Sequence, residues 1–200
     1  LMIGFMMRFC AQVLRVLVPV LFLSVPARTA LAADTLAKIK EKKELRVGLD
    51  PGFIPFEMKN PKGEMIGFDV DMINGFAESL GAKAVFVDTR WEGIIPALVA
   101  KKFDLIVSGM TITEERKKTL LFSDPYYRAG LLALVSAKRK DAIKSAKDLD
   151  RKDATVVVKV GTTADQFAAK AFPKAVIRKL DSESDCANSV ALGKVDAFIT

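Results

Sequence analysis

Three short stretches of the sequence combine charged, hydroxyl-bearing, aromatic and glycine residues that could hold a small ligand. These stretches are residues 50–53, 108–116 and 159–163. Arg116 could bind a carboxylate through its planar pair of N–H donors, as could the backbone N–H groups at the start of a helix. Asp50 could bind an ammonium group, and the faces of Phe53 and Trp91 would attract a cation more weakly. The combination suits a small zwitterion.

Each of these features also has a plainer structural interpretation. The Ser108-Gly109 pair could form only a turn between a strand and a helix, and Thr111 could serve only as a helix cap. Arg116 lies in a charged run that is typical of an exposed helix face, and Trp91 could be a core residue. Residues 161–163 precede a helix but lack the ending of a phosphate-binding loop. The features gain weight together, because all of them follow strands and should fall on one sheet edge.

The composition excludes several classes of site. The 200 residues include no histidine and two cysteines, which rules out Ser-His-Asp and Cys-His nucleophiles, His-ligated metals and four-thiolate zinc sites. No metal or organic cofactor is implied. Half of the residues are hydrophobic and 28% are charged, which indicates an ordinary folded protein. The net charge is +7, and three of the positive charges lie in the first 33 residues. The remaining excess does not indicate nucleic-acid binding.

The first 32 residues have the layout of a secretory signal peptide. A basic start is followed by the largely apolar residues 13–25 and by the small residues of Ala30-Leu31-Ala32. The apolar stretch is shorter than the roughly 20 residues that a membrane span needs, and Arg15 interrupts it. We therefore expect export to a bacterial periplasm and cleavage near Ala32. Cys186 would then be the only thiol, and we expect it to be buried in a helix.

Strand and helix patterns alternate along the remaining chain, which predicts an α/β fold with parallel-rich sheets. Strands are expected at residues 45–49, 84–87, 105–107, 131–135, 155–160, 176–180 and 197–199. Helices are expected at residues 68–80, 91–100, 164–171 and 184–192, and a short one ends at residue 118. Thr111 or Thr113 should cap that short helix, and Thr163 the one that follows it. Residues 138–152 are charge-rich and should form a loop with one short helix.

A faint internal repeat suggests two similar halves. The segment from Asp88 to Asp104 parallels the segment from Asp181 to Asp196, at offsets of 93 and 92 positions. Any two strand–helix–strand units share this pattern, so the repeat alone leaves the question open. We predict two α/β lobes, residues 33–130 and 131–200. A ligand would lie between them, at the carboxyl ends of the strands.

Several motifs resemble those of the extracellular solute-binding proteins of family 3, which serve ABC importers of polar amino acids. The motifs are GLDPGFIPFE at residues 48–57, GFDVDM at 67–72, GIIPAL at 93–98, SGMTITEER at 108–116 and FSDPYY at 122–127. The resemblance extends over residues 45–200. It implies the two-lobed fold of type II periplasmic binding proteins, in which a hinge lets the lobes close over the ligand.

Carried over by position, the resemblance implies a ligand-binding set from both lobes. Its first-lobe members are Asp50, Phe53, Trp91, Ser108, Gly109, Thr111 and Arg116, and its second-lobe members are Lys159, Thr162, Thr163 and Thr200. Arg116 would clamp the α-carboxylate, and Phe53 and Trp91 would enclose the ligand side chain. Glu57 and Asp69 match the motifs but are expected to be structural.

The end of the sequence departs from the family pattern. In the family, the strand that matches residues 197–199 is followed by an aspartate that holds the α-ammonium group. The chain then returns to complete the first lobe. Here the sequence ends at Thr200, so we expect an incomplete second lobe and weak binding. A lost charge-assisted hydrogen bond is worth about 1.5–3 kcal/mol, or roughly ten- to a hundredfold in affinity.

The resemblance implies a periplasmic, monomeric protein that captures a polar L-amino acid and delivers it to an ABC permease in the inner membrane. It would perform no catalysis and bind no nucleic acid. Gly109 and the Asp50 wall favour an uncharged side chain such as that of glutamine, while a cationic ligand between Phe53 and Trp91 stays open. Two other functions also stay open. A cyclohexadienyl dehydratase on the same fold would need a general acid such as Glu57 or Asp50, and a sensor domain would need a following transmembrane segment.

Overall fold

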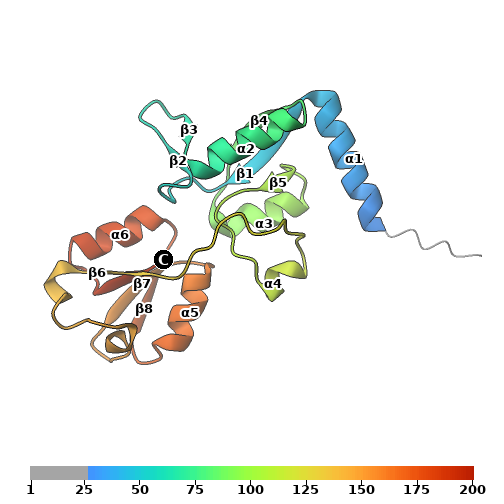
Figure 1. Ribbon diagram of the computed structural model, residues 1–200. Helices are drawn as coiled ribbons and strands as arrows, with labels where there is room; N and C mark the ends of the chain where they lie inside the picture. Colours follow the sequence, from blue (N-terminus) through green and yellow to red (C-terminus); the bar gives the residue numbers. More distant parts are fainter. Residues whose placement is uncertain (1–26) are drawn as a thin grey trace, which may run out of the picture.

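The computed structural model describes residues 27–200, and their side chains from residue 34 onward. The predicted signal sequence up to residue 26 lies outside the described residues. Helix α1 (Ala27–Lys42) runs through the predicted cleavage position and leads into the first strand (Figure 1). In the part of the chain that the structure describes, no helix has both the length and the apolar character that crossing a membrane requires.

The first lobe is built on a three-stranded parallel sheet. In spatial order its strands are β4 (Lys83–Asp88), β1 (Glu44–Leu49) and β5 (Leu105–Ile106). The connecting helices are α2 (Phe68–Ser79) and α3 (Trp91–Val99). The central strand carries the buried side chains Leu45, Val47 and Leu49. Gly48 lies against the ring of Phe103, which leaves no room for a Cβ atom.

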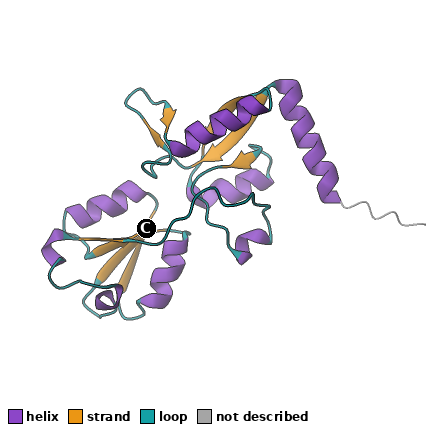
Figure 2. Ribbon diagram, in the orientation of Figure 1, coloured by secondary structure: helices purple, strands orange, loops and turns teal. Residues whose placement is uncertain are grey.

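The second lobe contains a four-stranded sheet. In spatial order its strands are β6 (Ala133–Val135), β9 (Ala197–Ile199), β7 (Thr155–Lys159) and β8 (Val176–Leu180). All pairings are parallel except that of β6 with β9. Helices α5 (Thr163–Ala171) and α6 (Glu183–Ala191) lie on the two sides of this sheet (Figures 1 and 2). The predicted α/β class with parallel-rich sheets is therefore confirmed.

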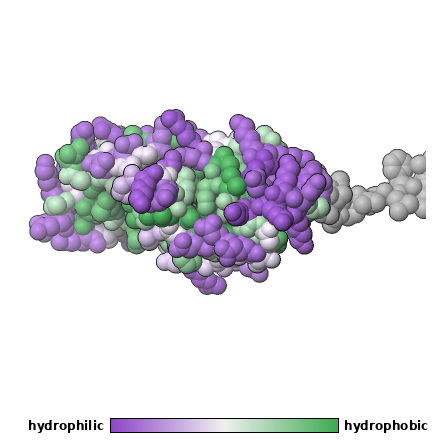
Figure 3. All heavy atoms as spheres, turned by 90° about the horizontal axis from the view of Figure 1, so that it is seen from above, coloured by the Kyte–Doolittle hydropathy of each residue, from purple (hydrophilic) through white to green (hydrophobic). Residues whose placement is uncertain are grey.

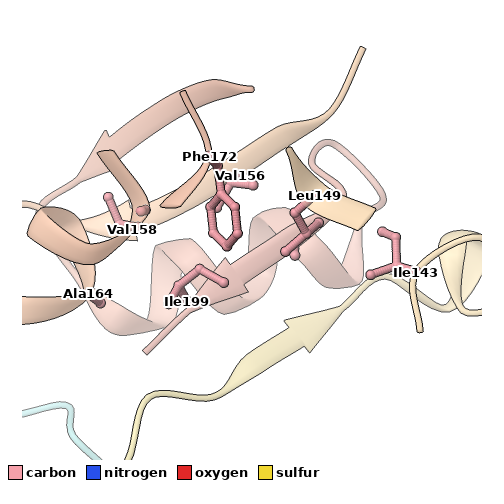
Figure 4. Close-up of a cluster of buried hydrophobic side chains, with 9 residues drawn as sticks. Ile143, Leu149, Val156, Val158, Ala164, Phe172 and Ile199 are labelled. Carbon is pink, nitrogen blue, oxygen red and sulfur yellow. The ribbon is translucent and has the colours of Figure 1, made fainter. Parts of the chain in front are cut away.

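Three consecutive valines show how the second sheet is packed. Val156 and Val158 join a core on one face with Leu149 and Phe172 (Figure 4). Val157 points to the other face and joins a second cluster that includes Cys186. A central parallel strand is covered on both faces, which explains its continuous apolar run. The prediction that Cys186 is buried in a helix is confirmed.

Several short elements differ from the sequence-based expectations. A hairpin of β2 (Met58–Lys59) and β3 (Met65–Ile66) was not predicted, because two-residue strands carry almost no periodic signal. The charge-rich stretch after β6 holds two 3₁₀ helices, η1 (Ala137–Arg139) and η2 (Ala146–Leu149), rather than one helix. The predicted short helix is α4 (Glu114–Lys117), and Thr113 caps it.

The internal repeat corresponds to a shared structural device. In the first lobe, the Asp104 carboxylate accepts a hydrogen bond from the backbone N–H of Arg46, at 2.9 Å. In the second lobe, the Asp196 carboxylate accepts one from the N–H of Thr155, at 2.8 Å. Each aspartate thus precedes the last strand of its unit and holds the first part of the central strand. The two lobes therefore share this hydrogen bond between an aspartate carboxylate and the backbone of a neighbouring strand.

Candidate functional site

Asp50 and Lys159 face each other across the two lobes. Asp50 directly follows β1 and Lys159 ends β7, so the carboxyl ends of two central strands meet here. Lys159 Nζ lies 2.6 Å from Asp50 Oδ2, and the two side chains are only 8% and 16% exposed. Asp50 Oδ2 also accepts a hydrogen bond from the backbone N–H of Trp91, at 3.0 Å. This ion pair connects the lobes and neutralises both charges.

Trp91 contacts both lobes as well. It begins α3, and its indole N–H donates a hydrogen bond to the carbonyl of Gly161 at 3.1 Å. The Arg116 guanidinium carbon lies 5.2 Å from the ring centroid, and Lys159 Nζ lies 5.7 Å from it. Cation–π contacts of this kind contribute about 0.5–2 kcal/mol each. Trp91 therefore borders the first-lobe core and also forms part of the junction.

Arg116 is held at the junction by backbone carbonyls. Its Nη1 donates to the carbonyl of Thr111 at 2.8 Å and its Nη2 to that of Gly161 at 3.4 Å. The α4 helix that carries Arg116 is capped by Thr113, whose hydroxyl accepts the Arg116 backbone N–H at 3.2 Å. Partial burial lowers the pKa of the guanidinium, although arginine stays cationic at neutral pH. Its fork is thus positioned beside Trp91 rather than on an exposed helix face.

Ser108 binds the backbone of Asp50. The Ser108 hydroxyl accepts the backbone N–H of Asp50 at 3.0 Å and donates to Glu57 Oε1 at 2.8 Å. Both hydrogen bonds are internal, and Ser108 is buried. The geometry therefore gives this hydroxyl a structural task at the edge of the site.

Gly109 is required by its backbone conformation. Its φ angle is +54°, which favours glycine. A Cβ atom there would stand 3.0 Å from the ring of Phe53. Phe53 in turn stacks on Phe56, with ring centroids 5.2 Å apart. The positive φ angle and the nearby Phe53 ring thus explain why a glycine occupies position 109. The residue is therefore a weaker guide to ligand preference than the sequence suggested.

The helix that follows β7 begins one residue earlier than predicted. Thr162, not Thr163, is the N-cap of α5, because its hydroxyl accepts the N–H of Asp165 at 3.2 Å. The same hydroxyl donates to the carbonyl of Lys159 at 2.8 Å. Thr163 is the first helical residue. The capping-box spacing of Thr163 misled the prediction, because Thr162 has the extended backbone that a cap needs.

Thr200 lies beside a residue that the sequence-based analysis missed. The Thr200 hydroxyl donates to Glu183 Oε2 at 3.1 Å, and its backbone pairs with Leu132. Glu183 begins α6, and burial raises the pKa of its carboxyl while the nearby Lys159 charge opposes that rise. Glu183 lies at the start of a helix that follows a strand, as several of the predicted site residues do. This position in the sequence could have indicated Glu183 as a site residue.

A cavity of about 160 Å³ lies at the junction of the lobes. Its lining residues are Trp91, Glu92, Ile95, Met110, Arg116 and Gly161. A larger cavity of about 370 Å³ lies at the other end of the second sheet, near Thr155 and Asp196. Of the two cavities, only the smaller is lined by predicted site residues, namely Trp91 and Arg116. Within the described residues, no three potential metal ligands form a cluster.

The structure brings most predicted residues into one contact network. Asp50, Trp91, Arg116 and Lys159 contact one another directly or through Gly161. Thr111 contributes a carbonyl, Ser108 supports Asp50, and Thr162 binds the Lys159 carbonyl. Phe53 packs beside Gly109, while Thr163 and Thr200 occupy a helix start and a strand end.

Comparison with known proteins decides the family. Residues 45–187 match the model of the bacterial extracellular solute-binding proteins, family 3. The chain belongs to this family. It is 32% identical to the L-cystine-binding protein TcyJ of Escherichia coli over 82% of its own length. The chain spans about 61% of the length of that relative.

Solved structures of amino-acid-binding proteins resemble this family 3 protein more strongly. The ancestral amino acid-binding protein AncCDT-1, a precursor of cyclohexadienyl dehydratase, is 46% identical, with a TM-score of 0.81. The match covers 83% of this chain and 73% of that one. A putative ABC transporter binding component from Wolinella succinogenes, complexed with lysine, is 45% identical, with a TM-score of 0.75 over 80% of this chain and 68% of that one. These likenesses confirm the two-lobed α/β fold.

Proposed function

We propose that this family 3 protein captures a free L-α-amino acid between its lobes and delivers it to an ABC permease of the inner membrane. One observation carries the proposal: the Arg116 guanidinium and the Trp91 indole line one small cavity at the junction of the lobes, and the interlobe ion pair lies beside the same indole. The proteins described above as binding cystine or lysine, or as ancestral amino acid-binding proteins, support the same ligand class. The protein would act in the periplasm as a monomer.

The ligand backbone would bind at Arg116. The guanidinium directs two of its N–H groups to the carbonyls of Thr111 and Gly161, and arginine has five N–H donors. The remaining donors can form a charge-assisted pair with the α-carboxylate. The start of α5 lies next to Gly161 and adds the positive end of a helix dipole. Thr162 and Thr163 would therefore close over the carboxylate from the second lobe.

The Asp50–Lys159 pair favours an uncharged polar ligand side chain. At 2.6 Å the two groups already neutralise each other, so a ligand cation would have to compete with a nearly buried ammonium group. A carboxamide could instead donate an N–H to Asp50 and accept from Lys159. Glutamine fits this arrangement better than lysine or arginine. The cationic alternative is supported by the lysine complex of the relative from Wolinella succinogenes.

Capture would act through closure of the lobes. Asp50, Trp91 and Arg116 belong to the first lobe, and each contacts Lys159 or Gly161 of the second. A ligand that binds both sides favours the closed arrangement over the open one. The permease would bind the protein in this closed arrangement.

Calorimetric titration of the chain tests this proposal. Glutamine, lysine, arginine, histidine and cystine are each titrated up to millimolar concentration. Glutamine is expected to show saturable binding with the highest affinity. Glutaramic acid, which lacks the α-amino group, and 4-aminobutanamide, which lacks the α-carboxylate, serve as controls and should bind more weakly. The proposal fails if no amino acid binds, or if both control compounds bind as tightly as glutamine.

We further propose that the protein is not an enzyme. A dehydratase would need a general acid beside its substrate, and Glu57 lies behind Ser108 with only 1% of its surface exposed. The likeness to a precursor of cyclohexadienyl dehydratase makes the test worthwhile. Incubation with prephenate or arogenate should yield no aromatic product, and the appearance of one would overturn this proposal.

A further inference from the structure

Two fully buried carboxyl groups lie behind the Ser108-Gly109 segment. Glu57 is 1% exposed and Asp69 is 0% exposed. Glu57 follows the loop after β1, and Asp69 is the second residue of α2. Neither faces an arginine or lysine in a salt bridge among the described residues. Buried carboxylates without a cation are costly, so this arrangement requires an explanation.

Each carboxyl uses one oxygen to hold the segment in place. Glu57 Oε1 accepts the Ser108 hydroxyl, which accepts the N–H of Asp50. Asp69 Oδ2 accepts the backbone N–H of Gly109 at 3.2 Å and the hydroxyl of Tyr126 at 2.9 Å. The two acids therefore fix neighbouring residues of the same segment, and Glu57 also fixes Asp50 through Ser108.

The other oxygen of each acid has no conventional donor. Glu57 Oε2 and Asp69 Oδ1 are both buried and lack a hydrogen-bond partner within the described residues. The backbone N–H of Asp69 donates to the carbonyl of Phe56, the residue before Glu57, at 2.9 Å, which brings the two acidic residues close together. Two ionised carboxylates at that separation would repel strongly in a dry interior. A single proton between them would give both of these oxygens a partner.

The surrounding charges agree with one retained proton. Burial raises the pKa of Glu57 to about 8; the Ser108 hydrogen bond opposes the rise, and the Asp69 charge adds to it. Lys159 is the cation whose charge lowers this pKa, and it is already paired with Asp50. Burial and the Asp69 charge raise the pKa of Tyr126, so that phenol stays a donor.

We propose that Glu57 and Asp69 share one proton and act as positioning residues that hold Ser108 and Gly109 beneath Asp50. Glu57 carries the proton and donates a hydrogen bond to Asp69, which also accepts hydrogen bonds from Gly109 and Tyr126. Loss of the proton places two negative charges side by side and loosens the segment. The effect on capture rests on the proposed function, whereas the protonation state is measured without any ligand.

Infrared spectroscopy of the ligand-free chain tests the shared proton directly. At pH 7 the wild-type protein should show the carbonyl-stretching band of a buried protonated carboxyl, and this band should be lost in Glu57→Gln. Glu183→Gln is the matched control, because Glu183 is another carboxyl whose pKa burial raises, and this variant should keep the band. The proposal is overturned if the wild type lacks the band, or if the band persists in Glu57→Gln.

The pH profile of stability tests the positioning role. Unfolded Glu57 ionises near pH 4.5, whereas the folded group keeps its proton up to about pH 8. The wild type should therefore lose stability relative to Glu57→Gln as pH rises across that interval, with no further divergence above it. Asp69→Asn offers a second variant should Glu57→Gln not fold, since its amide can donate to Glu57. Parallel profiles for the wild type and the variant that folds would contradict the role.

Binding measurements separate this inference from the proposed function. If the proposed function holds, glutamine should bind the wild type more weakly at pH 9 than at pH 7, and Glu57→Gln should show a smaller loss. If no amino acid binds any variant, the proposed function fails while the infrared result still decides the shared proton. Equal losses in the wild type and Glu57→Gln would contradict the positioning role alone.

Discussion

Two acidic regions contact the Ser108-Gly109 segment, one at the cleft and one in the interior, and they are neutralised in different ways. On the cleft side, Asp50 is paired with Lys159 from the other lobe at 2.6 Å. On the buried side, Glu57 and Asp69 have no such cation, and we propose that a proton takes its place. The cleft pair therefore depends on how the lobes meet, while the buried pair depends on pH.

The two regions differ in which parts of the molecule they connect. Arg116, Trp91 and Lys159 each form a hydrogen bond across the junction of the lobes. Glu57 and Asp69 bind residues of the first lobe alone, through Ser108 and Gly109. Motion between the lobes can break the first set without disturbing the second. Substitutions on the two sides should therefore separate stability from binding. Exposed apolar side chains belong to neither set, and Ile54, Leu121 and Leu132 are examples. Figure 3 shows hydrophobic areas in green on one face of the molecule.

The largest effect is expected from Asp69→Ala on the buried side. The substitution leaves the N–H of Gly109 and the hydroxyl of Tyr126 without their acceptor, so the free energy of unfolding should fall by about 2–4 kcal/mol. Chemical denaturation measures this change. Asp71→Ala, at an exposed position of the same helix, should cost about 1 kcal/mol or less. Equal losses in both variants would show that the buried side has no special importance.

Arg116→Ala should separate binding from stability on the cleft side. Loss of the charge-assisted pair with the α-carboxylate should weaken amino-acid binding roughly a hundredfold. The free energy of unfolding should fall by about 1 kcal/mol or less, because Arg116 is only half-buried and binds two carbonyls. Calorimetry and denaturation measure the two quantities. Lys118→Ala, on the exposed face of the same segment, is the control and should change neither.

Lys159→Met should change ligand preference more than affinity. Without the ammonium group, Asp50 is free to bind a cationic side chain, so arginine should gain roughly tenfold relative to glutamine, about 1.4 kcal/mol. Competition calorimetry measures the ratio. Lys179→Met is the matched control, because Lys179 pairs with Asp165 within the second lobe at 2.9 Å. An unchanged ratio in Lys159→Met would refute the role assigned to the interlobe pair.

The smallest effect concerns the two neighbouring threonines of the second lobe. Thr162→Ala removes the N-cap of α5 and should lower the free energy of unfolding by about 1 kcal/mol. Thr163→Ala should lower it by less, because Thr163 is already helical. Thermal unfolding of the two variants gives the ranking. A larger loss for Thr163→Ala would restore the cap predicted from the sequence spacing.

The longer elements could be predicted because their periodicity is set by local chemistry. The run of Val156, Val157 and Val158 predicts a strand, and the strand of residues 176–180 is predicted with its observed bounds. The order of strands and helices also predicts that Asp50, Lys159 and Arg116 lie near the carboxyl ends of the strands in the two sheets. The motifs then indicate the family. The β2–β3 hairpin and the cap at Thr162 were not predicted, because both depend on backbone conformation rather than on periodicity.

The sequence by itself determined the residue types at the strand ends, the absence of histidine and the α/β class, since these follow from composition and local pattern. Only the tertiary structure decided that Lys159 neutralises Asp50, that Glu183 lies beside Thr200, and that Glu57 and Asp69 are both buried behind Ser108 and Gly109. Such pairings join residues far apart in the chain. Their energies depend on distance and burial, and neither quantity is written in the order of the residues.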